Sequence, residues 1–304
     1  MRGAADTVPG DGVKQQVVFF GAASVAVVLA LVGVAVPRAV EVSVLAAAVL
    51  VLGVPHGALD VLHARRAWQL DRPARWAVFL LVYVLLAAAV VAAWVTAPSI
   101  SLVGLLVISA FHFSGDLESG TPVPLRIVHG LAPICLPALL HAEALGELFA
   151  ALATAGTAAD LVRLLEWAAR PLLAATVLSV AWAARRRRHR RAALEVSTTA
   201  AVCAIAAPLV GFGVYFCLLH SWRHVARTNH LCRPTPAEFR WAAGLPTVAT
   251  GLGAGLAFFL LEPEAWATGL VQVVFVGLAA LTVPHMLLIE RIRLAGWQVR
   301  PRAA

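Results

Sequence analysis

Residues 76–97 read WAVFLLVYVLLAAAVVAAWVTA, an apolar run without a charged side chain. A helix needs about 20 such residues to cross the hydrocarbon core of a bilayer. Similar runs recur along the 304-residue chain, which is 61% apolar and 13% charged, whereas soluble domains carry about 25% charged residues. This composition excludes a soluble enzyme and predicts an all-α, polytopic bundle of transmembrane helices.

Hydropathy divides the chain into about ten candidate spans within one integral-membrane domain, residues 1–304. A polar tail (1–14) precedes the spans and a basic tail (294–304) follows them. The segment 194–230 would be one tilted helix in a nine-span alternative, but Pro208 and the triplet 211–213 (GFG) are helix breakers, so two spans are favoured. The ten predicted spans are 17–36, 41–62, 76–97, 99–116, 124–142, 161–184, 194–210, 212–230, 241–261 and 267–290.

The arginines predict the orientation of the bundle. With ten spans, four basic clusters fall on the same side as both termini, and clusters of this kind face the cytoplasm. The loops on the opposite side, 97–99, 143–160 and 262–266, are neutral or acidic. We therefore expect a multi-pass cell-membrane protein, surrounded by lipid, with both termini cytoplasmic. Its net charge of +8 then reflects orientation and implies no nucleic-acid partner. The basic clusters occupy residues 65–75, 185–191, 223–233 and 291–302.

Ten histidines stand in this apolar chain, and ionisable side chains inside a bilayer usually mark a site or a pathway. Five of them lie in polar clusters near the ends of predicted spans. The clusters are GVPHGALD (53–60), SAFHFSGD (109–116), CLLHSWRH (217–224) and TVPH (282–285), the last followed by Glu290. The other five have no partner at helical spacing and are interpreted as interfacial or packing residues. They are His63, His129, His141, His189 and His230.

Spacing within the clusters suggests shared helix faces. His56 precedes Asp60 by four residues, and His112 precedes Asp116 by four, so each pair would lie on one face of a helix. A third pair of the same spacing, two imidazoles one turn apart, is close enough to chelate a single metal ion. That pair is His220 and His224.

The predicted orientation places all four clusters at one depth, in the cytoplasmic half of the bundle. Imidazoles delivered to one level by four helices are what a metal centre between helices requires. Imidazole nitrogens suit iron, copper, zinc or nickel. Four of them without a thiolate favour non-haem Fe(2+), because a closed zinc site would usually include cysteine. Asp60 and Asp116 would then accept the distal N–H groups of ligating imidazoles.

In chain order, these motifs resemble the Brp/Blh family of integral-membrane β-carotene 15,15'-dioxygenases. Ser114 departs from the family pattern, in which glycine often follows the phenylalanine directly. The resemblance implies that dioxygen cleaves the central double bond of β-carotene into two all-trans-retinal molecules, with a retinal-accepting rhodopsin as a further partner. The matching stretches are PHGALD (55–60), SAFHFSGD (109–116), FCLLHSWRH (216–224) and TVPHMLLIE (282–290).

The resemblance also implies roles for individual residues. The iron ligands would be His56, His112, His220 and His224, with His285 and Glu290 as neighbours of the site. No catalytic residue beyond the metal centre is expected. Aromatic side chains near the ligands are candidates for the wall of a polyene tunnel. They are Phe111, Phe113, Tyr215, Phe216 and Trp222.

Two other functions use the same residue types. Histidines and acids inside a membrane also build transporters and relays for protons or metal ions, although these often show inverted repeats, which the sequence lacks. Axial histidines on separate helices can also hold a b-type haem. A Soret band would reveal the haem, and ion flux without carotenoid cleavage would reveal the transporter.

Overall fold

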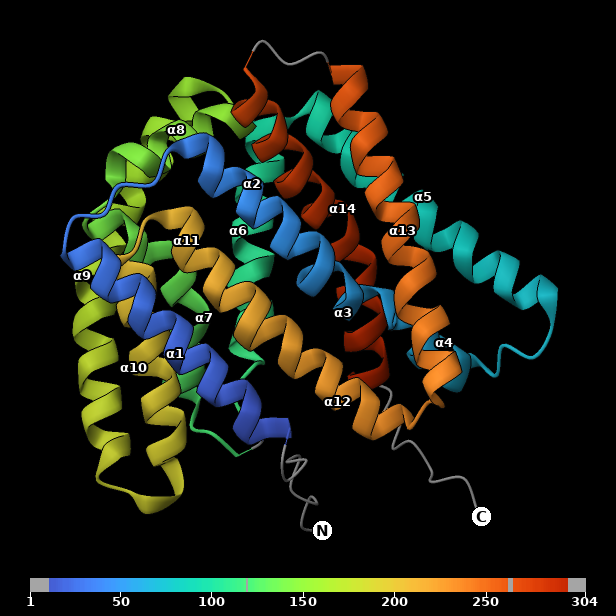
Figure 1. Cartoon of the computed structure of the whole chain (residues 1–304), viewed down its shortest axis with the longest axis horizontal. Coiled ribbons are helices and arrows are strands. Elements are labelled where there is room, and N and C mark those ends of the chain that lie inside the picture. Colours follow the sequence, from blue (N-terminus) through green and yellow to red (C-terminus); the bar gives the residue numbers. More distant parts are fainter. Residues whose placement is uncertain (1–10, 119, 262–264, 295–304) are drawn as a thin grey trace.

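The computed structural model describes residues 11–118, 120–261 and 265–294, and the regular secondary structure in these ranges is all helical (Figure 1). The predicted tails fall largely outside these ranges, except that the first helix already begins at Asp11. In chain order the segments are α1 (Asp11–Leu31), α2 (Arg38–Ala48), η1 (Val49–Gly53), α3 (Val54–Ala58), α4 (Asp60–Trp68), α5 (Pro73–Thr96), α6 (Pro98–Ser114), α7 (Val123–Cys135), η2 (Leu136–Leu139), α8 (Ala142–Leu152), α9 (Ala155–Ala184), η3 (Arg187–His189), α10 (Arg190–Ile205), α11 (Pro208–Gly213), η4 (Val214–Ser221), α12 (Trp222–Cys232), α13 (Pro236–Leu261) and α14 (Trp266–Leu294).

Six helical stretches of the described chain are long and apolar enough to cross a membrane. A seventh crossing results if α7, η2 and α8, which bend by 110°, are taken as one span. The predicted count of ten is therefore not confirmed, although each predicted span coincides with a helix or a broken helix. Two of the three unconfirmed spans have a physical reason, because α6 and α10 have only 17 and 16 residues, fewer than the roughly 20 that a full crossing needs.

The segment 194–230 forms two helices. Helix α10 ends at Ile205, the next residue has extended backbone (φ −75°, ψ 156°), and α11 begins at Pro208. Proline is well suited to the first turn of a helix because its missing N–H would have no partner there. The glycines at 211 and 213, in contrast, do not interrupt the chain, which continues as one helical rod through η4 and α12.

The prediction of a loop at 143–160 is wrong over most of its length. Residues Ala142–Leu152 form α8, which buries Leu145, Leu148 and Leu152 against the bundle. These apolar residues recur at intervals of three and four, the pattern of a helix with one buried face. Hydropathy missed this helix because it is too short to cross a membrane.

Two broken rods run side by side through the middle of the molecule. One consists of α2, η1, α3 and α4, and the other of α11, η4 and α12 (Figure 1). Helix α14 packs against the first rod, and α6 packs against α7. Each rod contains a π-helical segment, η1 or η4, in which the wider turn changes the direction of the following side chains.

The connections that carry the basic clusters gather on one side of the bundle. In Figure 1 the α9–α10 and α12–α13 connections and the last turns of α14 lie at the bottom, and the α4–α5 connection lies at the lower right. The α5–α6 and α8–α9 connections lie at the top. The arginine-rich connections therefore lie on the opposite side of the bundle from the neutral connections.

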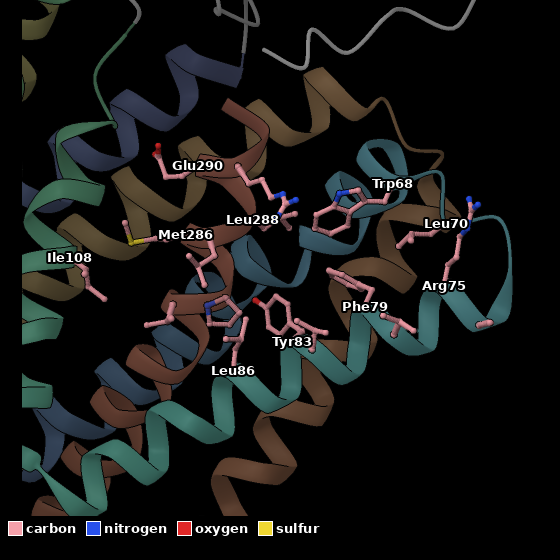
Figure 2. Close-up of a pocket in the computed structure, with 17 residues that line it drawn as sticks. Trp68, Leu70, Arg75, Phe79, Tyr83, Leu86, Ile108, Met286, Leu288 and Glu290 are labelled. Carbon is pink, nitrogen blue, oxygen red and sulfur yellow. The ribbon is translucent and has the colours of Figure 1, made fainter. Parts of the chain in front are cut away.

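A groove of about 1340 Å³ opens between α5 and α14 (Figure 2). Phe79 and Tyr83 of α5 and Met286 of α14 line the groove. Its lining also includes the charged residues Arg75 and Glu290, which Figure 2 labels. Apolar side chains such as Val78, 61% exposed, form much of the rest.

Candidate metal centre

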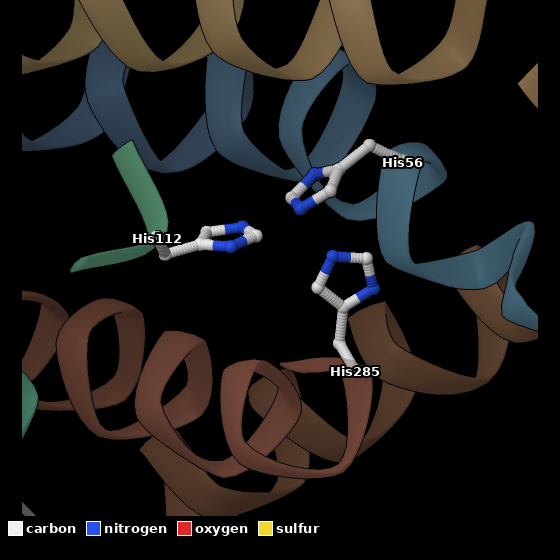
Figure 3. A group of neighbouring side chains, drawn as sticks. All are labelled: His56, His112 and His285. Carbon is white, nitrogen blue, oxygen red and sulfur yellow. The ribbon is translucent and has the colours of Figure 1, made fainter. Parts of the chain in front are cut away.

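Five histidines meet in the middle of the bundle. The centroids of neighbouring imidazole rings lie 4.8–5.5 Å apart, although the rings come from four regions of the sequence. Three of them offer nitrogens that all lie within 4.8 Å of one another, and Figure 3 shows these rings pointing toward a common centre. The three are His56, His112 and His285; the other two are His220 and His224.

Glycine makes two close approaches around this cluster possible. At Gly53, the last residue of η1, a Cβ atom would lie 2.9 Å from the Phe216 ring, so only glycine lets that ring pack beside His56. At Gly130 of α7 a Cβ atom would lie 2.3 Å from the carbonyl oxygen of Ala110. Helix α6, which carries His112, can therefore lie directly on the backbone of α7.

Four of the five imidazoles have a buried Nε2 atom without a hydrogen-bond partner. An unsatisfied buried polar atom costs roughly 1–3 kcal/mol, so four in one cluster require an explanation. A cation bound by these nitrogens would satisfy all of them, and neutral imidazole is a common ligand of first-row transition metals. The donor set therefore fits a metal ion. The four residues are His112, His220, His224 and His285.

The opposite edges of two imidazoles are fixed by carboxylates. His220 Nδ1–H donates to Asp116 Oδ1 at 2.9 Å, and His285 Nδ1–H donates to Asp60 Oδ1 at 2.8 Å. A proton held on Nδ1 leaves Nε2 free to coordinate a metal. The second oxygen of each carboxylate accepts a tyrosine hydroxyl, from Tyr215 at 2.6 Å in Asp116 and from Tyr83 at 3.0 Å in Asp60.

The sequence predicted that these carboxylates accept from imidazoles of the site, but the spacing did not indicate which imidazoles. Asp60 bonds to His285 of α14, and it lines a cavity together with His56, four residues before it. Helix α6 ends at Ser114, so Asp116 lies beyond the helix that carries its expected partner. Both carboxylates therefore join different segments of the bundle. His56 instead directs Nδ1 to the carbonyl oxygen of Gly53.

Two cavities of about 110 Å³ each flank the histidines. The first is lined by His56, His112 and His220 together with apolar residues of α6, α7, α8 and α14. The second is lined by His56, Asp60 and His285 together with residues of α5 and α13. Both include Leu278, and the second also shares Phe79 and Tyr83 with the groove of Figure 2.

The five predicted tunnel residues have different surroundings. Phe113 and Phe216 line the first cavity, and the Phe216 ring stacks on His220 with 5.4 Å between centroids. Tyr215 is fully buried, and its hydroxyl donates a hydrogen bond to Asp116. Phe111 is 54% exposed and is not among the residues that line either cavity.

Two further predicted residues lie away from the ring cluster. Trp222 is half-buried and does not belong to the described lining of either cavity. Glu290 lines the outer groove.

Sequence reasoning missed three residues near the centre. His63 is buried, its Nε2 lies 3.0 Å from the Thr228 hydroxyl, and its ring lies 6.1 Å from that of His224. The interval of seven residues from His56 was a usable signal, because it returns a side chain to one face after two turns. His129 is fully buried beside Tyr215, at 5.6 Å between centroids. Tyr83 had no signal beyond being a polar residue in an apolar run.

Fold and site together define an all-helical protein of membrane type with a buried polyhistidine centre suited to a metal ion. A family model described as "Beta-carotene 15,15'-dioxygenase" matches residues 47–293. The chain belongs to this family of carotenoid-cleaving dioxygenases, which confirms the resemblance predicted from the motifs.

Two curated relatives share most of the chain. The beta-carotene 15,15'-dioxygenase of an uncultured marine bacterium, 66A03, is 32% identical over 259 residues, covering 81% of this chain and 92% of that protein. The probable beta-carotene 15,15'-dioxygenase Blh of Halobacterium salinarum is 29% identical over 304 residues, covering 87% of this chain and 88% of that protein. No solved structure matches the chain.

Proposed function

We propose that the protein cleaves the central 15,15' double bond of β-carotene with dioxygen and gives two molecules of all-trans-retinal. The observation that carries this proposal is the cluster of four buried, unpartnered Nε2 atoms beside apolar cavities. The reaction is balanced without a reductant, because both oxygen atoms of dioxygen end in the two aldehydes. Membership of the family favours this activity over ion transport or haem binding.

We assign the centre to non-haem Fe(2+), held by His56, His112, His220 and His224. The convergence of their rings supports this set, and the unpartnered Nε2 of His285 adds a fifth candidate ligand. Bound iron would supply a site that activates dioxygen. The protein would contribute the fixed direction of the imidazoles, through Asp60 and Asp116, and the exclusion of water by the apolar walls.

Both cavities are lined by His56, as a long apolar substrate that reacts at its midpoint would require, and at about 110 Å³ each they would have to widen to hold its two halves. A polyene running past His56 would place one half in each cavity and its central bond beside the imidazoles. Burial of apolar surface contributes about 25 cal/mol per Å², so such walls can hold a hydrocarbon without polar contacts. The groove between α5 and α14 would admit the substrate from the bilayer, since it shares Phe79 and Tyr83 with the second cavity.

The protein is proposed to lie in the cell membrane with both termini in the cytoplasm. The gathering of basic connections on one side of the bundle supports this orientation, because arginine-rich connections are retained on the cytoplasmic side. Retinal released into the bilayer would be available to a rhodopsin, which we propose as its acceptor.

Expression in bacteria that accumulate β-carotene tests the reaction. Loss of orange colour with formation of retinal is expected, together with bound iron in the purified protein. Replacing any of the four proposed ligands by alanine should abolish both iron binding and cleavage. His141→Ala is the matched control, because the His141 ring contacts the backbone of Ile205, remote in sequence from the histidine motifs. Persistent colour with folded, iron-containing protein would refute β-carotene cleavage.

A further inference from the structure

The sequence contains two tyrosines, and both are hydrogen-bonded in the same way. Tyr215 donates its hydroxyl to Oδ2 of Asp116 at 2.6 Å, while Nδ1–H of His220 donates to Oδ1 of the same carboxylate at 2.9 Å and also lies 3.1 Å from Oδ2. Tyr83 donates to Oδ2 of Asp60 at 3.0 Å, while Oδ1 accepts Nδ1–H of His285. The chain therefore builds the same three-residue arrangement twice, from unrelated segments.

The tyrosine hydroxyl restricts the rotation of the carboxylate in this arrangement. A carboxylate bonded at one oxygen only can rotate about its Cβ–Cγ bond and offer either oxygen, or neither, to the imidazole. A second bond at Oδ2 restrains this rotation and keeps the carboxylate directed at Nδ1. The imidazole then keeps its proton on Nδ1 and its Nε2 toward the other rings, where it has no other partner.

We propose that Tyr83 and Tyr215 are matched positioning residues of the metal centre, each acting through a carboxylate on one imidazole. This inference rests on the metal centre of the proposed function. Neither hydroxyl contacts the imidazole itself in the described hydrogen bonds, so the effect of each tyrosine depends on Asp60 or Asp116.

The two tyrosines differ in their surroundings, which gives them separable roles. Tyr215 is fully buried and packs against Phe113 at 5.1 Å between centroids. The ring of Tyr83 lines both the second cavity and the outer groove, so it separates the centre from the membrane (Figure 2). Tyr83 would therefore position an imidazole through its hydroxyl and bound the substrate space through its ring.

Metal affinity of purified protein tests the positioning role. Tyr83→Phe and Tyr215→Phe remove one hydroxyl each and keep the ring. We expect each to raise the dissociation constant for Co(2+), measured by competition with a chelator, about 3- to 10-fold, as loss of one hydrogen bond predicts. The d–d absorption of bound cobalt should also shift, because it reports ligand geometry. Ser197→Ala, which removes a hydroxyl that bonds only to the α10 backbone, should leave both measurements unchanged.

A double-mutant cycle distinguishes action through the carboxylate from a general packing effect. Asp60→Ala removes the acceptor of both bonds, so Tyr83→Phe should have no further effect on cobalt affinity in that background. Thermal unfolding of the metal-free proteins provides the second measurement. A tyrosine that merely supports the fold would lower the melting temperature of the metal-free protein and leave the cobalt affinity of the folded fraction unchanged.

The outcomes separate this inference from the proposed function. Cobalt affinity within twofold of the unaltered protein in both phenylalanine variants would overturn the positioning role, even if cleavage of β-carotene is observed. Failure to recover folded metal-free protein from either variant would also overturn it, in favour of a structural role. Failure of the unaltered protein to bind cobalt or iron would instead overturn the metal centre itself.

Discussion

A methyl group added at Gly130 should move His112, a proposed metal ligand, without touching it. A Cβ atom there would lie 2.3 Å from the Ala110 carbonyl oxygen and 2.8 Å from the Ser114 amide nitrogen, whereas ordinary contacts begin at 3.4 Å. Both atoms belong to the backbone of α6, so relief requires α6 to move by about 1 Å from α7. These residues bracket His112, which must move with the helix. A displacement of this size in a catalytic group can reduce the rate by about 100-fold.

The assay for Gly130→Ala is the initial rate of retinal formation by purified protein, with iron content and thermal unfolding measured on the same sample. We expect a large loss of rate. The loss of stability should be smaller, because overpacking costs about 1–3 kcal/mol while alanine gains about 1 kcal/mol over glycine in a helix.

Gly104→Ala is the control, because it lies on the same α6 and a Cβ atom there would meet no atom within 4 Å. An unchanged rate and melting temperature in Gly130→Ala would refute this account of helix contact.

Other substitutions test separate parts of the site. Asp116→Asn should weaken iron retention about 10- to 100-fold in a chelator titration, whereas Asp160→Asn, at an exposed ion pair, should not; equal retention in both would remove the role of Asp116. Glu195→Gln leaves the charge of the buried Arg223 without its partner and should lower the free energy of unfolding by about 3–5 kcal/mol; a change below 1 kcal/mol would contradict this. Val78→Trp narrows the outer groove and should raise KM for β-carotene several-fold with unchanged iron content. An unchanged KM would argue against entry by this route.

The convergence of the histidines could be predicted from the sequence because their motifs lie at the same depth along the predicted membrane spans. Span boundaries and arginine positions placed the motifs of His56, His112, His220 and His285 at one level, and helices that pack together bring residues at one level close to one another. The carboxylate pairings could not be predicted in this way. They depend on contacts between segments far apart in the sequence and, for Asp116, also on the end of α6 at Ser114.

Local patterns also fail where a residue acts only through its surroundings. Nothing near Tyr83 in the sequence distinguishes it from its apolar neighbours, because its partner Asp60 lies 23 positions away on another helix. Helix α8 was missed for a related reason, since its apolar face covers other helices instead of crossing the membrane. Hydropathy measures transfer into lipid and does not distinguish a lipid-facing surface from a helix-facing one.

The unequal walls of the two cavities have a consequence for substrates with unlike ends. β-Carotene has identical halves, so its two binding orientations are equivalent. The two cavities, in contrast, differ in their walls. The first cavity is lined by many leucines and phenylalanines, whereas the second includes Asp60, Tyr83 and Thr250. A carotenoid hydroxylated on a single ring could therefore bind in two orientations that are not equivalent. The protein would favour the orientation in which each end of the substrate lies in the cavity that suits it.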